Sequence, residues 1–180
     1  MVEEIGYSTG DYGEVVIGFV VTNPNQDQLL ENVSLQMTVR DADGVILDTD
    51  PEFKIGDLLP GETFGMGTSL FVDDVSKVST VEVEAMFDGS EESDALNPVS
   101  IVQINAGSGG YGYVGEVSNE GDADVDDALV GFVVRDGSGA IVGGGFTDVM
   151  DLPAGGSLTF DAPYVVAEGT TVEPYGHVYY

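Results

Sequence analysis

The sequence contains no cysteine, no tryptophan, one histidine and only four lysine or arginine residues among 180. Without cysteine, a disulfide scaffold and a Cys–His catalytic pair are both excluded. Thirty-three acidic residues give a net charge of −29, and polyphosphate binding needs Lys and Arg to displace counterions. The same sign of charge opposes binding to anionic membranes. We therefore expect neither nucleic acid nor an anionic membrane as a direct partner.

Helical periodicity and a targeting segment are also missing. Wherever ten or more residues run without Gly or Pro, apolar residues at spacings of three and four are absent, which argues against helices. The opening Met1-Val2-Glu3-Glu4 is acidic and lacks the charged and apolar regions of a signal peptide. A cysteine-free chain fits a cytosolic protein, and it fits an exported one slightly better. We expect an exported or cell-surface-anchored protein whose signal or anchor is not in this chain.

What the sequence does contain is apolar residues at a period of two, which is typical of half-buried strands. Hydrophobic residues make up 42% of the chain, too many for an acidic disordered tail, and 26 glycines and 7 prolines separate the strand-sized runs. One predicted core face consists of Val15, Ile17, Phe19 and Val21, and a second of Val33, Leu35, Met37 and Val39. Turn residues such as Asn23-Pro24-Asn25, Asp43-Gly44 and Gly137-Ser138-Gly139 follow such runs. The pattern predicts an all-β, antiparallel sandwich fold.

An internal repeat sets the domain organisation. Val21-Thr22-Asn23 matches Val117-Ser118-Asn119, Val39-Arg40-Asp41 matches Val134-Arg135-Asp136, and Leu59-Pro60 matches Leu152-Pro153, in the same order and at similar intervals. The polar stretch from Asp88 to Pro98 separates the two copies. We expect two tandem β-sandwich domains, residues 1–92 and 93–180, each near the lower limit of autonomous domain size.

The second copy carries a resemblance to a known family. It runs Val114-Gly115-Glu116-Val117-Ser118-Asn119, then Phe132-Val133-Val134-Arg135-Asp136-Gly137, then Asp151-Leu152-Pro153-Ala154-Gly155. This order resembles the FxLYD domain family, with Arg135 where the family has tyrosine. The first copy is further from the pattern, and its Val21-Thr22-Asn23-Pro24-Asn25 is also similar to the water-stress domain of late-embryogenesis-abundant proteins.

The FxLYD resemblance implies an immunoglobulin-like or fibronectin-like sandwich on secreted or lipid-anchored proteins, without catalytic residues. The residues themselves have predicted structural roles. Phe132 and Val134 share one face and should lie in the core, while Asp136 and Asn119 should accept hydrogen bonds from backbone N–H groups at turns. Arg40 and Arg135 occupy equivalent places among many carboxylates, so each is expected to pair with an acid.

Enzyme motifs are absent. A Ser-His-Asp triad would depend on His177 alone, and no Gly-x-Ser-x-Gly sequence accompanies it. We predict His177 to be a partly exposed strand residue. The glycine run Gly107-Ser108-Gly109-Gly110 lacks the lysine and helix of a phosphate loop and is expected to be a hairpin. Carboxylate pairs are too numerous in this chain to indicate a glycosidase. We expect no enzyme.

Calcium is the chemical alternative, because it prefers six to eight oxygen ligands. The densest cluster contains Asp122, Asp124, Asp126 and Asp127, and a second contains Asp41, Asp43, Asp48 and Asp50. Neither has the spacing of an EF-hand loop. Asp122, Asp124 and Asp126 are therefore weak candidate ligands, a solvated loop is the favoured interpretation, and no cofactor is expected.

Function remains open at this level. The acidic residues are spread over both copies, with 20 acids against 3 bases in residues 1–92 and 13 against 1 in residues 93–180, as in halophilic proteins. We expect a non-catalytic module for protein interaction or spacing, whose partner is a protein or a cell-envelope component. A calcium-dependent adhesion module and a stress-protective soluble protein are the alternatives. Aromatic residues available for a partner are Tyr7, Tyr12, Tyr111, Tyr113, Tyr175, Tyr179 and Tyr180.

Overall fold

The computed structural model describes residues 1–107, 112–162, 169 and 171–179. Within them the chain is almost entirely β, with two single-turn 3-10 helices, η1 (Asp11–Gly13) and η2 (Val75–Lys77). The all-β prediction is confirmed. The strands are β1 (Val2–Thr9), β2 (Glu14–Thr22), β3 (Gln28–Arg40), β4 (Ile46–Leu58), β5 (Thr63–Phe71), β6 (Thr80–Met86), β7 (Gly89–Glu92), β8 (Val99–Ala106), β9 (Tyr113–Asn119), β10 (Val125–Arg135), β11 (Ile141–Leu152), β12 (Ser157–Ala162) and β13 (Thr171–Val178).

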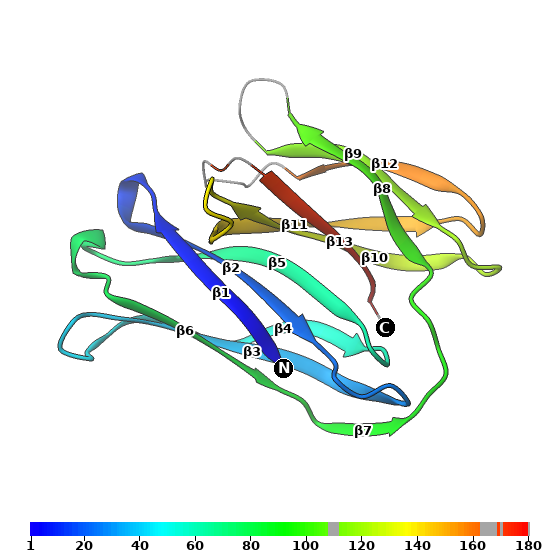
Figure 1. The fold of residues 1–180 in the computed structure, drawn as a ribbon, viewed down its shortest axis with the longest axis horizontal. Coiled ribbons are helices and arrows are strands. Elements are labelled where there is room, and N and C mark those ends of the chain that lie inside the picture. Colours follow the sequence, from blue (N-terminus) through cyan, green and yellow to red (C-terminus); the bar gives the residue numbers. More distant parts are fainter. Residues whose placement is uncertain (108–111, 163–168, 170, 180) are drawn as a thin grey trace.

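These strands form four antiparallel sheets, two from the first half (residues 1–92) and two from the second half (residues 93–180). We call β4-β3-β6 the first outer sheet, β1-β2-β5 the first inner sheet, β11-β10-β13 the second inner sheet and β12-β9-β8 the second outer sheet. All strand pairs among the described residues lie within one half. Figure 1 shows the first half in blue to green and the second half in green to red.

The strand order repeats between the halves. The order β1-β2-β5 of the first inner sheet corresponds to β8-β9-β12, and β4-β3-β6 corresponds to β11-β10-β13. The two halves therefore share one strand order. The polar segment after Asp88 differs from expectation, because Gly89–Glu92 form β7, which pairs with Gln28–Glu31 of β3. The part of β3 that extends beyond the end of β6 has backbone N–H and C=O groups without a partner in β6, and Gly89–Glu92 pair with it despite their polar side chains.

Each half encloses a core between its own two sheets. The first core contains Val15, Ile17 and Phe19 of the inner sheet, packed with Leu35 and Met37 of the outer sheet, and all five are fully buried. The second is divided between two clusters on the corresponding faces, which include Phe132, Val134, Val130 and Val117. The predicted core positions Phe132 and Val134 are confirmed, since both are 0% exposed.

Equivalent polar residues build equivalent corners in both halves. The Asn23 side chain donates to the Leu58 and Leu59 carbonyls and accepts from the Asn25 N–H, while the Asn119 side chain donates to the Ala123 and Leu152 carbonyls and accepts from the Gly121 N–H. Both asparagines are 0% exposed, so these bonds satisfy groups that water cannot reach.

Equivalent aspartates likewise organise the hairpin turns. The Asp41 carboxylate accepts from the Asp43 and Val45 N–H groups, and the Asp136 carboxylate accepts from the Ser138 and Ala140 N–H groups. The hydrogen bond from the Ser138 side chain lowers the pKa of Asp136. The predicted turn-forming roles of Asn119 and Asp136 are confirmed.

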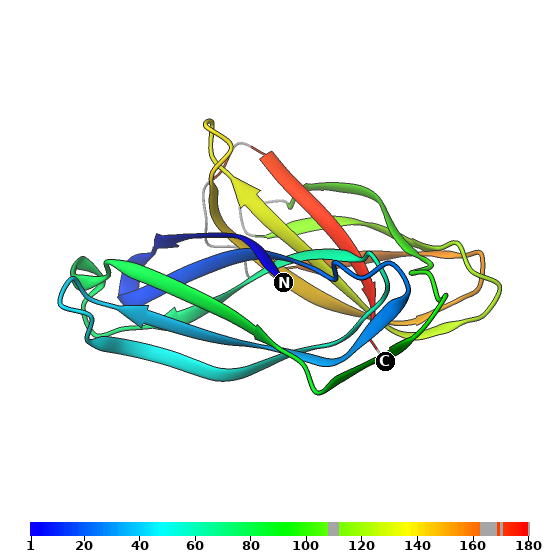
Figure 2. The same cartoon turned by 60° about the horizontal axis from the view of Figure 1, so that its bottom comes forward.

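The two halves pack on each other through their inner sheets, so the four sheets form one continuous stack. The central strands of these sheets, β2 and β10, are buried on both faces: residues 15–21 and 128–134 are all buried. Leu129 of the second half belongs to the core cluster of the first half. Figures 1 and 2 show β10, β11 and β13 lying against β2 and β5.

Candidate functional site

Outside the two cores, the inner sheets of the two halves contact each other, and we call this contact the inter-half interface. A row of three glycines, Gly6, Gly18 and Gly67, crosses the first inner sheet, because Gly6 pairs with Gly18 and Gly18 pairs with Gly67. Strand β11 lies across this row. A Cβ on Gly6 would be 1.9 Å from the Ile141 carbonyl oxygen, and one on Gly67 would be 2.4 Å from the Gly144 Cα. Two backbones approach this closely only where side chains are absent.

Equivalent positions in the two halves carry different side chains where only one of them faces the interface. On β10, Leu129, Gly131 and Val133 point toward the first half, and the equivalent residues of β3 are Ser34, Gln36 and Thr38. A Cβ on Gly131 would be 2.3 Å from the Gly65 carbonyl oxygen. The interface therefore joins two non-equivalent sheets, and its residues are specialised for that single contact.

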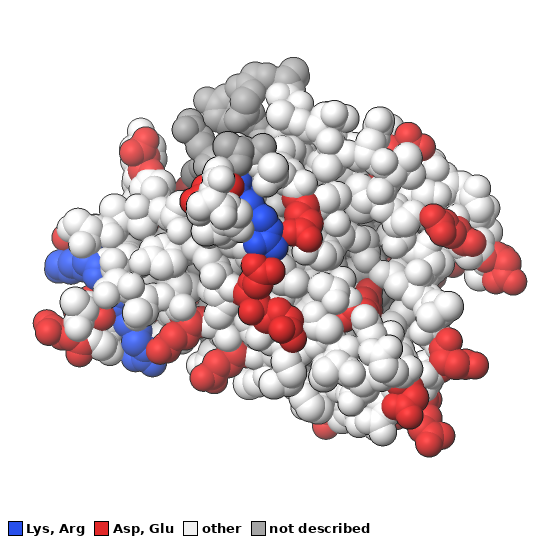
Figure 3. All heavy atoms as spheres, viewed as in Figure 1, with Lys and Arg blue, Asp and Glu red and all other residues white. Residues whose placement is uncertain are grey.

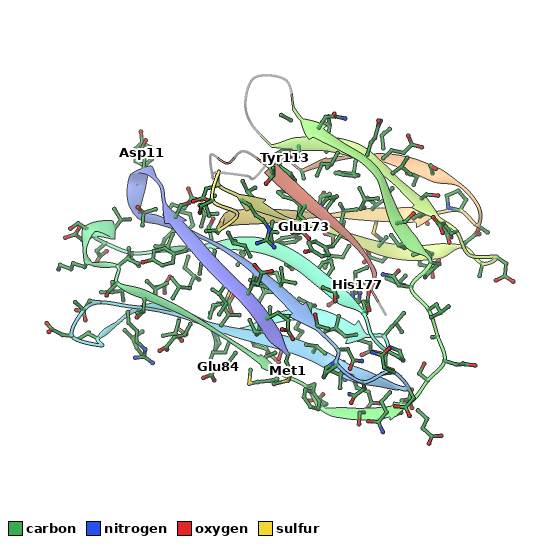
Figure 4. All side chains as sticks on the ribbon, viewed as in Figure 1. Met1, Asp11, Glu84, Tyr113, Glu173 and His177 are labelled. Carbon is green, nitrogen blue, oxygen red and sulfur yellow. The ribbon has the colours of Figure 1, made fainter. Side chains whose placement is uncertain are left out.

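Arg135 connects the halves at one edge of the interface. Its guanidinium donates twice to the Glu4 carboxylate of β1, with N–O distances of 2.7 and 3.1 Å, and its Nε donates to Glu173 of β13 at 2.9 Å. The hydrogen bonds from Arg135 lower the pKa of Glu4, and those to Glu4 raise the pKa of Arg135. Figure 4 shows Glu173 on β13. The predicted ion pair of Arg135 is confirmed, although its bidentate partner lies in the other half.

Arg40, the equivalent residue of the first half, also forms its predicted ion pair. Its Nε donates to the Glu82 carboxylate at 2.9 Å, and its Nη1 donates to the Gly44 carbonyl at 3.2 Å. Arg135 makes the corresponding bond to the Gly139 carbonyl at 3.1 Å. The Arg40 pair lies wholly within the first half, so of the two arginines Arg135 is the one that connects the halves.

His177 lies inside the interface, and the prediction that it is partly exposed is wrong. Its side chain is 0% exposed, with Nδ1 2.9 Å from Glu62 Oε1 and Nε2 3.0 Å from the Ile55 carbonyl oxygen. Both acceptors belong to the first half. Figure 4 places His177 near the end of β13. The alternation of Tyr175, His177 and Tyr179 indicated a strand with one solvent-exposed face. In the structure, the first half packs against that face at His177.

Asn97, in the segment between the halves, binds the same carboxylate. Its Nδ2 donates to Glu62 Oε1 and to the Gly176 carbonyl, each at 2.7 Å, and its Oδ1 accepts from the Val99 N–H. Glu62 Oε2 accepts from the Leu59 N–H at 2.9 Å. One carboxylate thus joins the β4–β5 turn, the connecting segment and β13. The sequence signal for this cluster was weak, since Glu62 is one of 33 acids.

Aromatic contacts also cross the interface. Phe53 meets Phe146 edge-on with ring centroids 5.6 Å apart, and Phe64 meets Tyr175 at 6.4 Å. Burial is the main cause that raises the pKa of Tyr175, and its hydrogen bond with Glu173 adds to this effect. Of the predicted contact tyrosines, Tyr12 is fully exposed and Tyr179 is 39% exposed. Tyr7, Tyr113 and Tyr175 are partly buried, and Tyr111 and Tyr180 lie outside the described residues.

A groove of about 650 Å³ opens where β5 and β11 meet, at the edges of the two inner sheets. Its aromatic walls are Phe71, which is 63% exposed, and Phe146, and Glu14, Asp148 and Asp161 also line it. No Lys or Arg is among the residues that line it. The groove combines apolar walls with carboxylates, a composition suited to contact with a partner that carries apolar and cationic groups.

The candidate calcium ligands do not converge. Asp122, Asp124 and Asp126 line a shallow hollow of about 610 Å³ beside Pro98 and Val178. The Asp124 carboxylate accepts from the Ala154 N–H at 2.9 Å, a loop-stabilising contact. Within the described ranges, no group of three or more His, Asp or Glu side chains is placed to hold a metal ion.

The second predicted aspartate cluster supports loops and strand ends. Asp41 organises its own turn, Asp50 accepts from the Glu52 N–H, and Asp48 accepts from the Thr49 and Phe71 N–H groups. The Asp48 contact links β4 to the end of β5. These carboxylates are used as local hydrogen-bond acceptors.

Figure 3 shows acidic side chains scattered over one face of the molecule, in both halves, with few basic side chains among them. In the part of the chain that the structure describes, no helix is long and apolar enough to cross a membrane. No protein-family model and no curated protein matches this chain.

Proposed function

We propose that the chain is a rigid, non-catalytic tandem β-sandwich module that holds a partner-binding surface at a fixed distance and orientation. The proposed setting is exported or cell-surface-anchored, with a protein or cell-envelope component as the partner. In this proposal the halves are immunoglobulin-like or fibronectin-like domains, as the FxLYD resemblance implies.

The observation that carries the proposal is the inter-half interface. Flexible tandem domains meet through small polar surfaces, whereas these halves share buried apolar residues, a glycine row and polar bonds to Glu4, Glu62 and Ile55. Because both faces of β2 and β10 are buried, separating the halves would expose apolar surface. Rigidity of this kind suits a spacer or a presenting module.

The groove between β5 and β11 is the surface that we assign to the partner. It forms only when the halves are docked, since Phe71 comes from the first half and Phe146 from the second. A fixed interface therefore also fixes the shape of the groove. Exposed aromatic residues are common energetic centres of protein interfaces.

The acidic surface of both halves suits a protein that works in a concentrated salt solution. The two halves carry net charges of −17 (3 − 20) and −12 (1 − 13). At about 1 M salt the Debye length is about 3 Å, so the repulsion between neighbouring carboxylates is largely screened. An even distribution of charge favours adaptation to salt over a single acidic binding patch.

Small-angle X-ray scattering of the whole chain, at several salt concentrations, tests the rigid-module proposal. The expected scattering curve is the one calculated from the docked halves, unchanged between about 0.5 and about 3 M NaCl. A distance distribution with a second, extended population would overturn it. Capture of binding partners by the wild-type and Phe71→Ser chains then tests the groove. Phe87→Ser is the matched control, because Phe87 is also exposed and lies outside the groove.

A further inference from the structure

The buried side chain of His177 belongs to the second half and binds the first half. His177 is the single histidine of the chain, and no part of its side chain reaches solvent. Its ring lies against Phe64 of β5, with centroids 5.1 Å apart. Both ring nitrogens meet oxygen atoms of the first half. Every polar contact of this second-half side chain therefore crosses the interface.

The partners of the two nitrogens fix where protons must lie. A backbone carbonyl only accepts hydrogen bonds, so the contact of Nε2 with the Ile55 oxygen at 3.0 Å requires a proton on Nε2. An ionised carboxylate also only accepts, so the contact of Nδ1 with Glu62 Oε1 at 2.9 Å requires a second proton on Nδ1. A histidine that donates from both nitrogens is an imidazolium cation.

The Glu62 carboxylate is surrounded by hydrogen-bond donors. Its side chain is 6% exposed, and it receives the Leu59 N–H at Oε2 and the Asn97 amide at Oε1 in addition to the histidine. Two neutral donors already point at this carboxylate before the imidazole is counted. Hydrogen bonds to a carboxylate stabilise its negative charge.

The other elements around the ring supply few competing charges. Strand β10 places Leu129 opposite His177, and β5 contributes the Phe64 ring. On β4, Gly56 faces the ring edge at Nε2 and also the Tyr179 ring. Of the titratable groups on these described elements, Glu62 contacts the imidazole directly, and the Tyr179 ring lies beside Gly56.

We infer that His177 is held as a doubly protonated imidazolium and that its buried pair with Glu62 is a proton-dependent lock between the two halves. The inference concerns the interface alone and does not rest on the proposed partner. Removing Glu62 leaves the buried imidazolium without its counterion until it gives up the Nδ1 proton, and removing His177 leaves the Glu62 carboxylate buried without its counterion. Either change costs far more than losing an exposed ion pair. Loss of the Nδ1 proton has the same effect, since a lone pair then faces the Glu62 carboxylate.

Nitrogen-15 NMR of the whole, uniformly labelled chain tests the charge state directly, because one histidine gives one unambiguous set of ring signals. At neutral pH we expect both ring nitrogens of the wild type to show protonated, pyrrole-type shifts. In Glu62→Gln the neutral amide removes the counterion, and we expect Nδ1 to become pyridine-type while Nε2 keeps its proton. A pyridine-type nitrogen in the wild type would overturn the inference, whether Glu62 is then ionised or protonated.

A double-mutant cycle tests the lock. We expect His177→Gln and Glu62→Gln each to lower the equilibrium constant for folding at least tenfold, and the double variant to lose about tenfold less than the product of the two. The matched control is the cycle of Arg40→Gln and Glu82→Gln, an ion pair within the first half, for which little coupling is expected. No coupling between His177 and Glu62 would contradict the lock. If the variants fail to fold, the wild-type ring shifts still decide the matter.

Discussion

Gly18 of β2 lies so close to β11 that a Cβ on it would be 2.3 Å from the Gly143 carbonyl oxygen and 2.6 Å from Ile141 Cγ2. Real Cβ atoms do not approach a carbonyl oxygen this closely, so even the smallest side chain at this position must push the strands apart. The separation of the two inner sheets is therefore set by the absence of side chains at a few positions. This dependence on single glycines makes the interface directly testable.

We expect Gly18→Ala to destabilise the docked chain by about 2 kcal/mol, the usual cost of overpacking a well-packed interior. Denaturant unfolding measures the free energy, and X-ray scattering measures whether the halves separate. The matched control is Gly137→Ala, because Gly137 has open space where a Cβ would lie, and its substitution should change stability by less than about 0.5 kcal/mol. Equal effects of the two substitutions would show that the sheets do not meet at Gly18.

The Arg135–Glu4 contact should contribute to docking, whereas the Arg40–Glu82 contact should not. We expect Arg135→Gln to destabilise the chain by about 1 kcal/mol, a value kept low because the Glu4 side chain is half exposed. Arg40→Gln should cost less, and its scattering curve should match that of the wild type. An effect of Arg135→Gln no larger than that of Arg40→Gln would contradict the cross-interface role.

The same contact predicts a pH dependence. Because Arg135 lowers the pKa of Glu4 below its usual 4.5, the ionised form is favoured in the folded state. The stabilisation is therefore present above about pH 4.5 and is lost as the pH falls below that value. The measurement is the difference in unfolding free energy between the wild type and Arg135→Gln across this range. A difference that persists unchanged well below the usual pKa of Glu4 would contradict the ionic nature of the contact.

The pKa of Asp127 on β10 is raised, whereas that of Glu4 is lowered. Its Oδ1 is a buried atom without a hydrogen-bond partner in the described structure, and burial and the nearby Asp148 carboxylate raise the pKa of Asp127. Its charged form therefore opposes folding as the pH rises through the raised pKa. We expect Asp127→Asn to stabilise the chain at neutral pH by about 0.5 kcal/mol, because the side chain remains partly exposed.

Thermal unfolding at neutral pH and near pH 3 measures this effect. The gain from Asp127→Asn should disappear at the lower pH, where the wild-type carboxyl is neutral as well. Asp126→Asn is the matched control, since the neighbouring Asp126 is exposed, and it should have little effect at either pH. Destabilisation by Asp127→Asn at neutral pH would show that the Asp127 charge has a favourable partner.

Much of the fold could be predicted because the residues responsible act locally. Asn119 and Asp136 bond to backbone groups a few positions away, so short motifs reveal them. The duplication follows from the same motifs recurring in order. The sheet orders of the two halves agree with it because equivalent strands carry equivalent core faces.

The inter-half interface escaped prediction because it depends on which of two equivalent faces meets the other half. A signal was present in the uninterrupted runs of residues 15–21 and 128–134, since strands buried on both faces lose the apolar–polar alternation. Glycines inside a strand, such as Gly143 and Gly144, indicate close approach of another backbone. The partner of His177 could not be predicted, because it depends on how the halves dock and Glu62 has no distinguishing sequence context.

Salt and calcium should affect the chain very differently. With a net charge of −29, repulsion between carboxylates weakens the folded state at low ionic strength, and added salt screens it. We therefore expect the melting temperature to rise steadily between about 0.1 and about 3 M NaCl. Sucrose at matched osmolality is the control for exclusion of cosolute from the protein surface, and it should reproduce only part of the rise.

Calcium at millimolar concentration should leave the melting temperature at the value given by its ionic strength alone, because Asp122, Asp124 and Asp126 do not converge on one point. A true site would add about 2.7 kcal/mol at a hundredfold excess over its dissociation constant, and the shift would saturate and vanish with chelator. Magnesium at equal concentration separates specific binding from screening. A saturable stabilisation by calcium that is lost in Asp124→Asn would make the aspartate loop a metal site and favour an adhesion module over a spacer, since the loop would then acquire a function that its hydrogen bond to Ala154 does not explain.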